Sequence, residues 1–116
     1  MNQSQREALL DLLLASIYTD SHLSLKEDEA LQAALENLGW EAAKPREIFL
    51  CNSMNRARKV SESDAATADY IATRAAAFTD AESRKTALDH LERVFASDGT
   101  APAETSFLAR VRASFS

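Results

Sequence analysis

Residues 4–17 read SQREALLDLLLASI, a run in which apolar side chains recur at helical spacing. The stripe that we expect to face a core consists of Ala8, Leu9, Leu12, Leu13 and Ile17. Ser4 stands three residues before Glu7, which is the spacing of a capping box at a helix start. The sequence therefore predicts an amphipathic first helix capped by Ser4.

The rest of the chain has the composition of a helical protein. Among its 116 residues are 22 alanines, six valines and isoleucines together, two glycines and two prolines. Alanine and leucine favour helices, whereas the scarce β-branched residues favour strands. No segment alternates apolar and polar residues as a half-buried strand would. We expect an all-α fold, a compact bundle of about six helices in one domain spanning residues 1–116.

The later helices are placed by their start signals. Their expected caps or first residues are Ser24, Pro45, Ser61, Thr79 and Pro102. Short connections predict that helices adjacent in the chain pack antiparallel. The third helix carries Ile48, Phe49, Cys51 and Met54 as its apolar series, so Cys51 is expected to be buried as a small hydrophobe.

Two parts of the chain share one pattern. Leu10, Leu13, Ile17 and Asp20 have the same spacing as Leu88, Leu91, Phe95 and Asp98. A short loop follows each aspartate, and beyond it a glutamate begins another apolar series, Glu27 in the first copy and Glu104 in the second. The pattern predicts two pseudo-repeated helix-loop-helix hairpins.

These two loops also resemble those of the TerB-like family, named after tellurite-resistance protein B. The resemblance rests on residues 15–27, ASIYTDSHLSLKE, and on residues 95–104, FASDGTAPAE. It implies an all-helical bundle whose acidic loop residues bind a divalent metal such as calcium. It also implies a sensing or scaffolding module of a stress-response system, without established enzymatic activity. This chain has Ser21 where the family pattern has glycine, and its second loop is one residue shorter than its first.

The candidate metal ligands are Asp20, Glu27, Asp98 and Glu104. Calcium and magnesium prefer oxygen ligands, which carboxylates from two loops would supply. A different interpretation makes the same acids helix caps, because carboxylates accept hydrogen bonds from exposed amides at a helix start. Neither loop has the ligand spacing of an EF-hand. Both interpretations remain open at this point.

Charge and motifs limit the classes of function. A net charge of -5 argues against nucleic-acid binding, which depends on neutralising phosphates. No signal peptide or apolar run of about 20 residues is visible, so a cytoplasmic protein without a membrane span is expected. No phosphate loop, HExxH or GxSxG motif occurs, and we expect no enzyme.

The leading hypothesis is a non-catalytic interaction module for a protein partner, tuned by a divalent cation. The alternative is a purely structural or homo-oligomerising helical bundle, in which every loop acid is a cap. A third hypothesis, a hydrolase using the loop acids as general acid and base, needs two carboxylates in one cleft.

Overall fold

The computed structural model is all-helical, as the composition predicts. It describes residues 3–20, 29, 32–34, 36, 45–96 and 102–115, with backbone alone at 17–20, 95 and 102–105. Its helices are α1 (Gln3–Asp20), α3 (Arg46–Val60), α4 (Asp64–Ala75), α5 (Ala81–Ala96) and α6 (Pro102–Ser114). Residues 29, 32–34 and 36, which follow the expected helix start at Ser24, are helical too. The described residues contain no strand.

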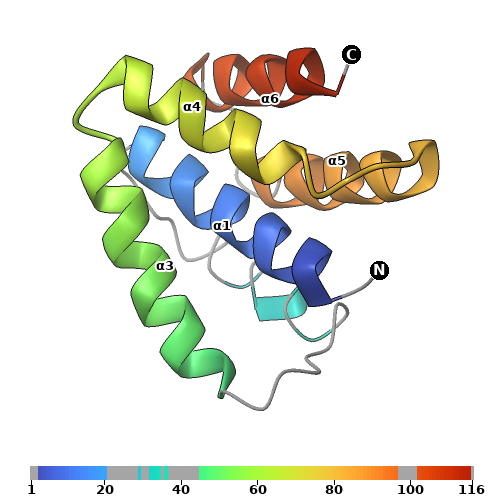
Figure 1. Cartoon of the computed structure of the whole chain (residues 1–116), viewed down its shortest axis with the longest axis horizontal. Coiled ribbons are helices and arrows are strands. Elements are labelled where there is room, and N and C mark those ends of the chain that lie inside the picture. The colour runs from blue at the N-terminus through green and yellow to red at the C-terminus, as the bar shows by residue number, and fades with distance from the viewer. Residues whose placement is uncertain are drawn as a thin grey trace.

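Helix α1 is the centre of the fold. It contacts α3, α4, α5 and α6, which surround it in Figure 1. From Ala8 to Ser16 every residue is buried, and none is more than 6% exposed. A helix that is buried on all sides has no solvent face, so the single stripe expected from the sequence describes only part of its packing.

The packing order of the helices differs from the expected one. Helix α3 contacts α4, and α5 contacts α6, as short connections predict. In the described part of the chain, however, α4 packs on α1, α3 and α6 and makes no contact with α5, its successor. Helices α4 and α5 instead share two neighbours, because each of them contacts both α1 and α6.

Several predicted helix starts move by one or two residues. Helix α1 already includes Ser4, so Ser4 is not its cap. Helix α4 is capped by Ser63 and not Ser61, because the Ser63 side chain accepts a hydrogen bond from the Ala66 amide. At α5 the Asp80 carboxylate accepts the Ser83 amide at 2.6 Å, a role that the sequence had suggested for Thr79. This hydrogen bond lowers the pKa of Asp80.

The other helix starts agree more closely with the sequence. Pro102 is the first residue of α6, as predicted. Pro45 immediately precedes α3 with an extended backbone, and its carbonyl accepts the Ile48 amide. None of the described helices is long and apolar enough to cross a bilayer.

The predicted pseudo-repeat remains a prediction. The loops that would define it, residues 21–28 and 97–101, lie outside the described residues.

Candidate functional site: a charged groove beside the central helix

The site is built around Asp11, the only charged residue between Ala8 and Ser16. Helical geometry places Asp11 in the middle of the buried part of α1, where it is 5% exposed. A carboxylate taken out of water is strongly destabilising unless charged or hydrogen-bonding groups replace the solvent. The partners of Asp11 therefore show which helices its carboxylate links to α1.

Three side chains donate hydrogen bonds to the Asp11 carboxylate. The Ser53 hydroxyl lies 2.5 Å from Oδ1, and Arg56 Nη2 lies 2.9 Å from the same oxygen. Arg74 Nε lies 3.1 Å from Oδ2. Ser53 and Arg56 come from α3 and Arg74 from α4. One carboxylate on α1 thus ties two surrounding helices to the central one.

Aromatic rings support both guanidinium groups. The central carbon of Arg74 lies 4.0 Å from the centre of the Tyr70 ring, and that of Arg56 lies 5.6 Å from the Phe49 ring. These distances allow cation–π attraction. Burial lowers the pKa of Arg56, but its hydrogen bonds and electrostatic interactions with Asp11 and Tyr70 together raise it, and the net pKa lies above its ordinary value. Arg56 is therefore a permanent cation here.

The buried Tyr70 completes the cluster. Burial raises its pKa, and the negative charge of Asp11 raises it further. The phenol is therefore neutral at physiological pH and contributes no charge. Asp11, Arg56 and Arg74 together carry one excess positive charge.

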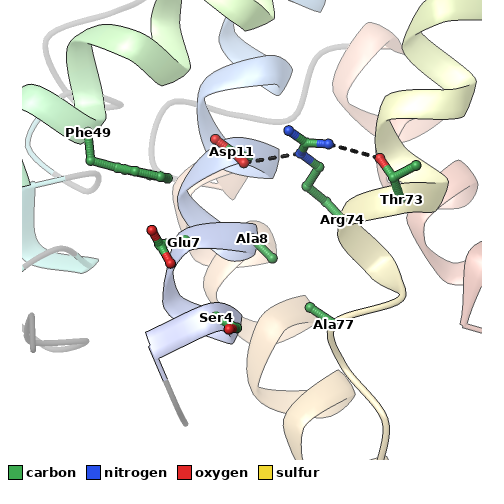
Figure 2. A pocket seen from close by; sticks show the side chains of 8 residues that line it. All are labelled: Ser4, Glu7, Ala8, Asp11, Phe49, Thr73, Arg74 and Ala77. Atoms are coloured by element: carbon green, nitrogen blue, oxygen red, sulfur yellow. Dashed lines mark hydrogen bonds and ion pairs between the residues drawn. The ribbon is translucent and has the colours of Figure 1, made fainter. Parts of the chain in front are cut away.

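An open groove with a volume of about 300 Å³ runs beside this cluster. Its lining comes from α1, α3, α4 and the turn after α4: Ser4, Glu7, Ala8, Asp11, Phe49, Thr73, Arg74 and Ala77. Figure 2 shows Phe49 and Glu7 on one side of α1, with Arg74 reaching Asp11 from the other side. Arg74 also donates to the Thr73 hydroxyl at 3.0 Å, which fixes its guanidinium at the groove.

Most polar side chains at this groove already have partners within the fold. Both Asp11 oxygens already accept hydrogen bonds from Ser53, Arg56 and Arg74. Ser53 is fully buried, so its hydroxyl is not accessible to a substrate. Glu7 is half-buried, and no described residue forms an ion pair with it. The carboxylate of Glu7 is thus the lining charge that remains available to a ligand.

The candidate metal ligands are only partly described. Asp20 is the last residue of α1, and Glu104 is the third residue of α6. Glu27 and Asp98 lie outside the described residues. Helices α1 and α6 are in contact and run in opposite directions in Figure 1, so the end of α1 and the start of α6 lie toward the same end of the fold. Among the residues that the structure describes, no group of three or more His, Cys, Asp or Glu could hold a metal ion.

The groove itself was missed from the sequence. Glu7 was interpreted as the second residue of a capping box with Ser4. The available signal was the single charge of Asp11 inside an otherwise apolar run, because such a residue needs a buried partner. Its partners lie 42, 45 and 63 residues away in the chain, so local spacing does not reveal them.

Comparisons with known proteins add no assignment. No protein-family model, no curated protein and no solved structure matches this chain.

Proposed function

We propose that this chain is a non-catalytic interaction module that binds a segment of a protein partner in the groove beside α1. A basic side chain of that segment would pair with Glu7 and lie against Phe49. The observation that carries this proposal is the Glu7 carboxylate, which forms no ion pair with a described residue and lies with Phe49 in the lining of an open groove.

Charge and shape both support a basic side chain as the ligand group. A lysine or arginine would gain an ion pair from Glu7 and cation–π attraction from the Phe49 ring. Asp11 does not compete for this cation, because Arg56 and Arg74 already neutralise it. The excess positive charge of the buried cluster would in turn favour an acidic residue elsewhere in the same segment. The resemblance to the TerB-like family, with its sensing and scaffolding members, supports the same class of function.

Selection from a random peptide library displayed on phage tests this proposal. We expect enriched peptides to share a lysine or arginine. Glu7→Gln should weaken the best peptide about tenfold, because a charge-assisted hydrogen bond contributes about 1.5 kcal/mol. Isothermal titration of the synthetic peptide measures this change.

The matched control is Glu62→Gln, the same substitution on the exposed turn between α3 and α4. It should leave peptide affinity unchanged. Enriched peptides without basic residues, or equal affinity for wild type and Glu7→Gln, would contradict the proposed groove. A selection that enriches nothing would favour the purely structural bundle.

The second part of the proposal is that a divalent cation tunes this module through Asp20, Glu27, Asp98 and Glu104. The opposite directions of α1 and α6 support it, because they bring the ends that carry Asp20 and Glu104 toward one end of the fold. Carboxylate oxygens are the ligands that calcium prefers.

Calcium titrated into chelator-treated protein should therefore give saturable heat that is lost in the Asp20→Asn/Asp98→Asn double variant. The control double variant is Asp64→Asn/Asp69→Asn, which removes two exposed carboxylates of α4 and should bind like wild type. An absence of heat up to millimolar calcium would instead leave the loop acids as helix caps.

A further inference from the structure

The outer face of α3 carries exposed apolar side chains. Ile48 is 48% exposed and Met54 is 40% exposed, and Cys51 is exposed as well. The sequence pattern had placed all three in the apolar series of the third helix and had predicted that Cys51 is buried, which is wrong. The core-facing side of α3 is formed instead by Phe49, Leu50, Ser53, Ala57 and Val60.

Four exposed residues on this outer face follow a heptad pattern. Glu47, Cys51, Met54 and Arg58 are separated by four, three and four residues. Such spacing keeps side chains on one line along a helix and is typical of the seam between two paired helices. We refer to this line of four residues as the seam. Ile48 lies beside it. In Figure 1, α3 lies at the edge of the molecule, with α1 and α4 on its inner side.

We infer that this face binds the same face of a second copy of the chain, with the two α3 helices antiparallel. This surface is separate from the groove, and the inference does not depend on the proposed function.

The charges of the seam select this occupant and this orientation. In an antiparallel pair centred midway between Cys51 and Met54, Glu47 lies opposite Arg58 of the second copy, and Cys51 lies opposite Met54 of the second copy. Twofold symmetry forms each of these contacts twice. A parallel pair would instead place Glu47 beside Glu47 and Arg58 beside Arg58, which like-charge repulsion disfavours. The seam is therefore complementary to itself in one direction only.

The length of the seam sets the expected affinity of the dimer. Helix α3 has 15 residues, so it is roughly 22 Å long. A single pair of such helices falls at the small end of specific protein interfaces. The expected product is a weak homodimer with a dissociation constant in the micromolar range.

Cysteine cross-linking tests the register. Cys51 is the only cysteine of the chain, and antiparallel pairing offsets the two copies of Cys51 too far for a disulfide. Met54→Cys puts a thiol opposite Cys51 of the second copy, so mild oxidation should yield a covalent dimer. Lys59→Cys is the matched control: it is exposed on α3 but not opposite Cys51, and it should remain largely monomeric.

Charge exchange tests the ion pairs independently. Glu47→Arg and Arg58→Glu should each raise the dissociation constant about tenfold in sedimentation velocity, since each creates two repulsive contacts in the dimer. The double variant Glu47→Arg/Arg58→Glu should restore wild-type association, because it exchanges the two charges without losing the pair.

Three results would overturn the inference. The first is a wild-type chain that stays monomeric at millimolar concentration. The second is a double charge variant that associates as weakly as the single variants. The third is efficient disulfide formation by wild-type Cys51, which would indicate parallel pairing, or by Lys59→Cys at the rate of Met54→Cys.

Discussion

Replacing Asp11 by asparagine is expected to lower the free energy of unfolding by about 2 to 4 kcal/mol, because removing one member of a buried ion pair leaves its partner charges uncompensated. This loss is smaller than the roughly 3 to 5 kcal/mol typical of a fully buried ion pair, since the side chains of Arg56 and Arg74 are 39% and 26% exposed and reach water in part. Urea unfolding followed by circular dichroism measures it.

Glu7→Gln is the matched control for this prediction. It makes the same change from carboxylate to amide one helical turn earlier on α1, where the side chain is only half-buried and no described residue pairs with it. Its unfolding free energy should stay within about 0.5 kcal/mol of wild type. Equal effects of the two substitutions would mean that Asp11 does not hold α3 and α4 to α1.

The second large effect is expected at Leu14, which lies outside the stripe that the sequence predicts for the first helix. Leu14 is buried as completely as Leu13, a member of that stripe. Leu14→Ala should therefore destabilise the protein by about 2 to 5 kcal/mol, as far as Leu13→Ala does, because each leaves a cavity in close-packed surroundings. The same urea unfolding experiment compares them.

A clear difference between the losses of unfolding free energy in Leu13→Ala and Leu14→Ala would contradict the central position of α1. If α1 had a solvent face, Leu14→Ala would cost less than about 1 kcal/mol while Leu13→Ala kept its full effect. Leu88→Ala on α5 provides a reference, because Leu88 is only half-buried and should fall between these limits.

The helical class of this protein follows from local chemistry. The chain has many alanines, few β-branched residues and a proline at the first position of α6. Each of these residues influences the backbone only locally, so they predict helices without knowledge of the fold. Helix starts were less accurate, since several polar residues compete for one cap. Ser61 and Ser63 stand two residues apart, and both are chemically suitable.

Which side of each helix is buried was decided by the tertiary structure. An apolar stripe indicates that one face packs, but it does not show whether other helices also cover the opposite face. On α1 four neighbours do so, and on α3 the apolar Ile48, Cys51 and Met54 remain outside. The same holds for Asp11, whose partners lie far away in the chain and meet it only when α3 and α4 pack on α1. Local sequence therefore determines that these segments are helices, whereas long-range packing determines where their charges and apolar faces meet.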